Sequence, residues 1–159
     1  MVCQIDQSHK IEQTEKDTVL ALSNNTKFTV LLKSKTKRAL QLRFRNNNKP
    51  EVFIYLVFAA LLAILIKSVS IHQRVYIDHE YLGHEDLIKL KLLQIFKKEK
   101  IAVDFNFVFV GKVSSAHALA SKVATKKMKP NKIVSEKEIL DLVLPKQKDR
   151  VSQTGPRSA

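Results

Sequence analysis

Few side chains in this sequence stand where they could carry out chemistry, and two aspartates are the first of them. Asp78 ends residues 74–78 (RVYID), whose β-branched and aromatic content predicts a short strand. Ligands of open α/β sheets gather at the carboxyl ends of strands, so Asp78 is a candidate for a functional site as well as for a simple loop position. Asp6 follows the short predicted strand 2–5 in the same way, although an Asx turn before Ser8 also accounts for it.

The histidines are the other residues whose chemistry could matter. His117 lies in a predicted helix, where it suits either a partly buried structural position or a group that transfers protons near neutral pH. His79 and His84 flank Asp78, but their spacing is not typical of a metal site. A lone Gly111-Lys112 pair before a helix is far from a phosphate-binding loop.

The elements that must position these side chains are organised around one apolar stretch. Residues 52–66 (VFIYLVFAALLAILI) carry no charged side chain and end before Lys67. As a helix they would span roughly 22 Å, less than the roughly 30 Å of a bilayer core. We therefore expect a buried core helix, with a membrane span as the alternative. Asn48, Pro50 and Glu51 are spaced as in a capping box at its start.

Before this helix the sequence favours strands. Residues 17–25 and 27–33 are apolar and β-branched on either side of Asn24-Asn25, which predicts a hairpin. Residues 33–48 are strongly basic and fit either a strand or one face of a helix, because the hydrophobic period is undecided over so short a run.

After the long helix, strands and helices alternate. Residues 83–100 have helical apolar spacing, and residues 103–110 (VDFNFVFV) alternate as a strand does. Residues 114–127 predict a helix capped by Ser114, and a last helix starts at the capping box of Ser135 and stops at Pro145.

This order predicts an α/β fold. We expect a mixed sheet, with antiparallel hairpin strands followed by parallel strands, and helices on both faces. Residues 1–144 would form a single domain, and residues 145–159 are predicted to be a disordered basic tail.

The same order of elements resembles the ribonuclease H-like superfamily, over roughly residues 2–127. Three short motifs add to the resemblance. Ile5-Asp6-Gln7-Ser8 is similar to the first strand of the family, which ends in an acid followed by a small turn. Asp78 with Tyr81 is similar to its fourth strand, which ends in an acid with an aromatic residue three positions on. Ser115-Ala116-His117-Ala118-Leu119-Ala120 resembles the start of its last helix, with His in place of Asp.

The resemblance implies a specific chemistry. Members of the family cleave phosphodiesters with two Mg²⁺ ions held by carboxylates that converge at strand ends. Asp6 and Asp78 would be the metal ligands here, and Glu80 and His117 would complete the catalytic set. The family's first long helix also supplies a glutamate, whereas the corresponding positions here are Tyr55 and apolar residues. A one-metal site, a site completed by Asp17 or Glu80, and a non-catalytic binding module are therefore all open.

The charge of the chain indicates a polyanionic partner. A net charge of +13 over 159 residues favours nucleic acid as the partner; a basic protein that is merely soluble is the second interpretation, and an anionic membrane surface is the third. No small-molecule cofactor is expected. Two clusters are predicted to contact the phosphate backbone of RNA, DNA or a hybrid: Lys35, Lys37, Arg38, Arg43 and Arg45 in the first, and Lys112, Lys122, Lys126 and Lys127 in the second.

The expected compartment is the cytoplasm. Cys3 is the single cysteine, so no internal disulfide forms, and this fits a reducing environment. The first residues are polar and contain no apolar run, so we expect no secretory signal.

Overall fold

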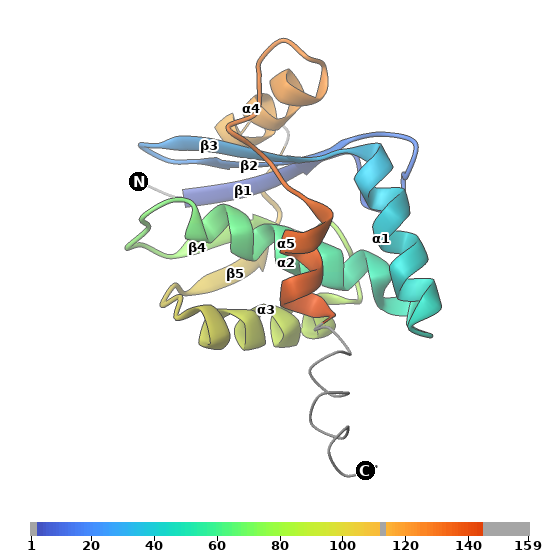
Figure 1. Cartoon of the computed structure of the whole chain (residues 1–159). Helices are drawn as coiled ribbons and strands as arrows, with labels where there is room; N and C mark the ends of the chain where they lie inside the picture. Colours follow the sequence, from blue (N-terminus) through green and yellow to red (C-terminus); the bar gives the residue numbers. More distant parts are fainter. Residues whose placement is uncertain (1–2, 112–113, 145–159) are drawn as a thin grey trace, which may run out of the picture.

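A six-stranded mixed sheet forms the centre of the computed structural model, which describes residues 3–111 and 114–144 (Figure 1). The strand order is β5-β4-β1-β2-β3-β6. The first three strands pair antiparallel, whereas β4 pairs with β1, β5 with β4 and β6 with β3 in parallel. This confirms the predicted mixed sheet. The strand bounds are β1 Cys3–Ser8, β2 Thr18–Ser23, β3 Lys27–Leu32, β4 Val75–Asp78, β5 Phe105–Val108 and β6 Lys132–Ile133.

Helices cover both faces of the sheet unequally. One helix, α4, packs over β1 and β2 on one face, and the others gather on the opposite face around α2 (Figure 1). The bounds are α1 Ser34–Asn46, α2 Phe53–Lys67, α3 Glu85–Glu99, α4 Ser115–Ala124 and α5 Glu136–Val143, with a 3₁₀ turn at Pro50–Val52.

The hairpin strands are buried from both sides, which explains their continuous apolar run. Along β2, Val19 and Ala21 belong to the core under α4, and Leu20 and Leu22 belong to the larger core under α2. Successive side chains of a strand point to opposite faces, so a strand covered on both sides is apolar at every position.

The long apolar stretch is the core helix of this larger cluster. Every residue of α2 from Leu56 to Ile66 is buried, and the helix packs against α3, α5 and the strands β2 and β3. By length and composition alone the helix Pro50–Lys67 could cross a membrane, but 61% of it is buried inside the protein. That burial fits the core helix expected from the sequence.

The predicted capping box before α2 is wrong. Asn48 takes a left-handed backbone conformation (φ 58°), and the N–H of Lys49 donates to the carbonyl of Phe44 at 2.8 Å. This is the bond that closes a helix C-terminus, so Asn48 ends α1 instead of starting α2. Pro50 begins the short 3₁₀ turn, and the first residue before α2, Val52, makes no side-chain cap.

The remaining elements mostly follow the predictions. The basic segment 33–48, which fitted either a strand or a helix, forms the helix α1. The short strand β6 was not predicted. Ser114 caps α4 and the capping box at Ser135 is present, as expected. The predicted tail, 145–159, lies outside the described residues.

Candidate metal centre

Asp6 and Asp78 lie on adjacent parallel strands in matching register. Cys3 pairs with Val75 and Ile5 pairs with Ile77, so Asp6 and Asp78 are the next residues of the two strands after the last pair. Side chains in register on neighbouring strands point to the same face, which here is the face covered by α4. Because β1 continues to Ser8, Asp6 is a strand residue, and the Asx-turn alternative is wrong.

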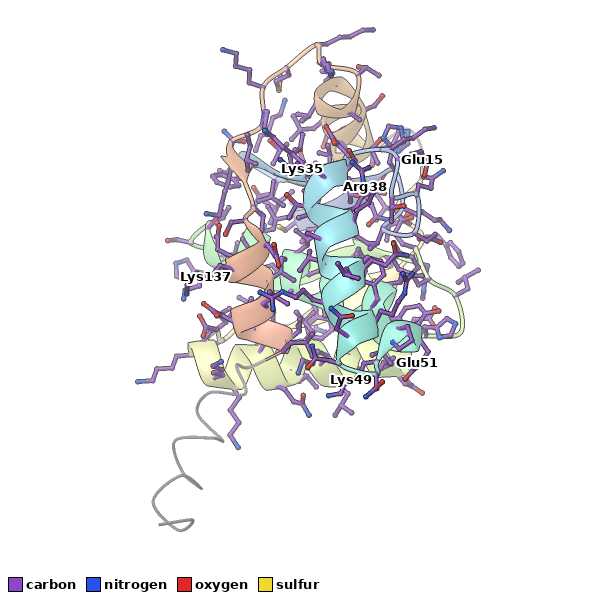
Figure 2. All side chains as sticks on the ribbon, turned by 45° about the vertical axis from the view of Figure 1, so that its right-hand side comes forward. Glu15, Lys35, Arg38, Lys49, Glu51 and Lys137 are labelled. Carbon is purple, nitrogen blue, oxygen red and sulfur yellow. The ribbon has the colours of Figure 1, made fainter. Side chains whose placement is uncertain are left out.

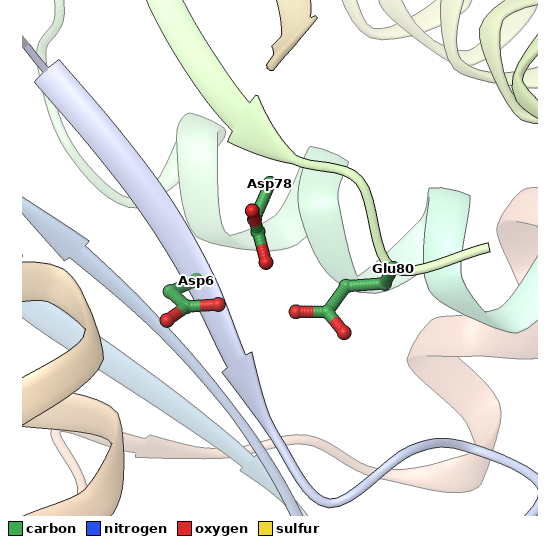
Figure 3. A group of neighbouring side chains, drawn as sticks. All are labelled: Asp6, Asp78 and Glu80. Carbon is green, nitrogen blue, oxygen red and sulfur yellow. The ribbon is translucent and has the colours of Figure 1, made fainter. Parts of the chain in front are cut away.

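Glu80 completes a cluster of three carboxylates. It lies two residues beyond the end of β4, and its side chain returns toward the two aspartates (Figure 3). One oxygen of each carboxylate lies within 4.8 Å of an oxygen of the others. Asp6 is buried and the other two are half-buried.

The crowding of three acids raises the pKa of Glu80 to about 9, through burial first, then hydrogen bonds to Asp6 and Asp78 and the negative charges of both. At neutral pH and without a cation, the Glu80 carboxyl therefore keeps its proton and donates it within the cluster. Three carboxyl groups so close together favour the binding of a proton or a cation among them.

Asp78 is fixed by a backbone group of Val110, two residues beyond the end of the neighbouring strand β5. Its Oδ1 accepts a hydrogen bond from the N–H of Val110 at 2.8 Å. Sequence reasoning missed this contact, because a backbone donor leaves no sequence signal. Asp6 accepts the N–H of Gln7 at 2.8 Å through Oδ1.

His117 closes the other side of the site. Its Nδ1 lies 2.8 Å from Oδ2 of Asp6, and its own backbone N–H is capped by Oγ of Ser114 at 3.0 Å. The side chain is 40% exposed, whereas that of Asp6 is 5% exposed, so the imidazole bridges a buried carboxylate and solvent. When Nδ1 donates to the carboxylate of Asp6, Nε2 of the neutral ring is left as an acceptor.

Asp17, an alternative member of the set, is used elsewhere. Its Oδ1 accepts the N–H of Ser34 at 2.8 Å, at the start of α1. Tyr55, which stands where the family's helix supplies an acid, stacks on His84 with ring centroids 4.1 Å apart. Within 3–111 and 114–144, the carboxylate group that could hold an ion is therefore limited to Asp6, Asp78 and Glu80.

This donor set fits a hard divalent cation. Three carboxylates supply oxygen ligands of the kind that Mg²⁺ and Mn²⁺ accept in proteins, and a cation would take the place of the shared proton. Asp6, Asp78 and Glu80 would hold it, with the imidazole of His117 beside Asp6.

One predicted nucleic-acid contact is wrong. Lys37 is fully buried, and its Nζ donates to the carbonyls of Lys10 at 3.2 Å and Gln13 at 2.7 Å and to Oγ1 of Thr18 at 2.9 Å. Burial lowers its pKa to about 8. It lies on the same buried face of α1 as Leu40, so its ammonium anchors the loop after β1 and cannot reach a phosphate.

The other basic residues of the first cluster lie on the outer surface of α1. Figure 2 shows Lys35 and Arg38 on this surface, and Arg45 is exposed further along the helix. Arg38 also donates to the carbonyl of Thr14, and Arg43 pairs with Glu136 at 3.1 Å.

The second cluster lies on the helix that carries His117. Lys122, Lys126 and Lys127 are exposed at the C-terminal end of α4 and just beyond it. At 1.5 Å per helical residue, Lys122 is about 7.5 Å from His117 along the axis of α4, and Lys126 and Lys127 follow the end of the helix. Lys112 lies outside the described residues.

No family model matches the sequence, and no curated protein or solved structure is significantly similar to it. The class of protein is therefore defined by fold and site alone: an α/β protein with a mixed six-stranded sheet and a three-carboxylate cluster on its α4 face.

Proposed function

We propose that this chain is a nucleic-acid-binding ribonuclease H-like protein that acts as a divalent-metal-dependent nuclease with a reduced carboxylate site. The observation that carries the proposal is the convergence of Asp6, Asp78 and Glu80, with His117 bonded to Asp6. The order of three antiparallel strands, a long helix and then β4, α3, β5 and α4 supports the family assignment. The elements α1, β6 and α5 are additions to the order of elements in that family.

The residues of the site have separate tasks in this proposal. Asp6 and Asp78, fixed by the strand ladder, and Glu80 hold the cation. When bound, Mg²⁺ supplies Lewis-acid stabilisation of phosphoryl oxygens and lowers the pKa of a bound water. Asp6 orients the imidazole of His117 through Nδ1. The Nε2 atom of His117 accepts a proton from the attacking water or returns one to the leaving oxygen.

The charge of the protein supports nucleic acid as the substrate class. The net charge is +13, and Lys122, Lys126 and Lys127 are exposed at the C-terminal end of α4, the helix that carries His117 at its start. Lysines bind phosphates as point charges and do not read bases, so the affinity would come from the nucleic-acid backbone and fall steeply with salt.

The test is cleavage of RNA, DNA and hybrid substrates with Mg²⁺ or Mn²⁺. Asp78→Asn should abolish cleavage and leave binding intact, because it removes one cation ligand and no basic residue. Asp104→Asn is the matched control: it removes the same charge at an exposed residue that contacts Arg74 at 3.7 Å. Undiminished cleavage by cleanly purified Asp78→Asn protein would refute the assignment.

A non-catalytic binding module on the same fold is the second candidate. It is favoured by one observation: α2 contributes no acid, so the described residues bring together three carboxylates and not the four of the family. Salt-sensitive binding with no turnover in either metal would support this candidate over the nuclease.

A further inference from the structure

Tyr81, the residue after Glu80, ties two loops together beneath the sheet. Its side chain is buried, and its hydroxyl accepts the N–H of Ile11 at 2.9 Å and that of the Gln7 amide at 3.2 Å. The ring packs edge-on against Phe58 of α2, with centroids 5.0 Å apart. The hydroxyl is therefore held between the core helix and the first strand.

The partners of this hydroxyl are the sequence neighbours of the site. Gln7 follows Asp6, and Tyr81 follows Glu80. Because side chains alternate along a strand, Gln7 points to the α2 face while Asp6 points to the α4 face. A contact between Gln7 and Tyr81 on one side of the sheet thus sets the separation of Asp6 and Glu80 on the other.

Glu80 needs such a tie because the strand ladder does not hold it. It lies two residues beyond Asp78, the last residue of β4, so no strand pairing holds its backbone in place. The Nζ of Lys10 donates to the carbonyl of Glu80 at 3.0 Å and lies 5.6 Å from the centre of the Tyr81 ring. Lys37 in turn holds the carbonyl of Lys10, so the loop after β1 is anchored to α1.

We propose that Tyr81 is a positioning residue for the candidate metal centre: through Gln7 and Ile11 its hydroxyl holds Glu80 within reach of Asp6 and Asp78. This inference rests on the proposed function, since it assumes that the three carboxylates bind a cation. Residues that orient metal ligands without touching the metal typically contribute about 10- to 100-fold to metal affinity.

The test is Mn²⁺ binding by the full chain, followed through the electron paramagnetic resonance signal of free Mn²⁺, without any assay of activity. Tyr81→Phe removes the hydroxyl and keeps the ring, and it should weaken Mn²⁺ binding about tenfold or more. Thr29→Val is the matched control. Thr29 is a buried residue of β3, which is separated from β1 by β2, and its hydroxyl donates to Oδ1 of Asn131 at 3.2 Å. Both variants lose a buried hydrogen bond, so both should melt at a lower temperature, but only Tyr81→Phe should lose affinity.

The outcomes are distinct. Equal Mn²⁺ affinity of the wild type and folded Tyr81→Phe would overturn the inference and leave the proposed function in place. A comparable loss of affinity in Thr29→Val would also overturn it, because the effect would then be one of general stability. No Mn²⁺ binding by the wild type would overturn the proposed metal centre and the inference with it. If Tyr81→Phe does not fold, Gln7→Met is measured instead, because it removes the amide that donates to the Tyr81 hydroxyl, and the same outcomes apply to it.

Discussion

The Nδ1 atom of His117 lies 2.8 Å from Oδ2 of Asp6, although 111 residues separate the two in the chain. The contact joins the first turn of α4 to the middle of β1, and therefore spans from a helix on the sheet's surface to a buried carboxylate. An imidazole oriented in this way is pre-arranged to exchange a proton on its exposed side.

The first prediction concerns this imidazole. His117→Ala should slow metal-dependent cleavage by about 10²- to 10⁴-fold, the usual contribution of a positioned proton-transfer group. Cleavage rates under single-turnover conditions measure it, and His72→Ala, an exposed histidine away from the carboxylate cluster, is the control. Equal rates for wild type and His117→Ala would remove His117 from the mechanism.

The second prediction is a pH dependence of stability without metal. The pKa of Glu80 is raised in the folded protein to about 9 from 4.5, so the folded state binds one more proton than the unfolded state between these values. Stability from this group is complete below pH 4.5 and is lost as pH rises toward 9. Urea unfolding in EDTA at pH 5, 7 and 8.5 should show the decline.

Glu80→Gln is the control for that measurement. It keeps the shape of a protonated carboxyl and cannot ionise, so the difference in unfolding free energy between variant and wild type should grow with pH. Millimolar Mg²⁺ should restore the free energy of unfolding of the wild type at high pH and change that of Glu80→Gln little. A pH-independent difference would show that Glu80 titrates normally.

The third prediction separates buried from exposed lysines on α1. Lys37→Ala should lower the free energy of unfolding by about 2–3 kcal/mol, because buried acceptors lose their donor. Lys35→Ala should change it by less than about 0.5 kcal/mol, since its side chain is exposed. Chemical denaturation measures both, and similar values would contradict the burial of Lys37.

The fourth prediction concerns the lysines at the end of α4. The double variant Lys122→Gln/Lys127→Gln should reduce the slope of log affinity against log salt by about 2, if each lysine neutralises one phosphate of duplex DNA. Lys89→Gln/Lys97→Gln on α3 makes the same change of charge at exposed positions and should leave the slope unchanged. Fluorescence anisotropy across a salt series provides the comparison, and equal slopes would exclude the α4 lysines as phosphate contacts.

Local sequence signals predicted the elements that are bounded by clear turn or capping residues or that have a clear apolar period. The hairpin around Asn24-Asn25, the helix α3 and the capped helix α5 all follow from such signals. The helix α1 did not, because one of its three buried positions is Lys37, which a hydrophobic pattern counts as polar. Whether a lysine ammonium can be buried depends on the acceptors around it, and two of those of Lys37 come from the loop after β1, which is distant in the sequence.

The candidate site was less accessible to sequence reasoning. The two aspartates were candidates because each follows a strand pattern, but their shared register depends on which strands pair. The approach of Glu80 depends on the loop beyond β4 and on Tyr81, for which the sequence offered only an aromatic residue after an acid. The Val110 donor and the Gln7 tie exist only once the chain has folded.

The burial of α2 has a consequence for synthesis of the chain. The helix is covered by strands that precede it but also by α3 and α5, which follow it. On the ribosome, part of its apolar surface therefore stays open until Val143 has emerged, 76 residues after Lys67, where the helix ends. During that interval the nascent chain displays a segment that, by composition, suits lipid as well as protein, so chaperone binding is most valuable there.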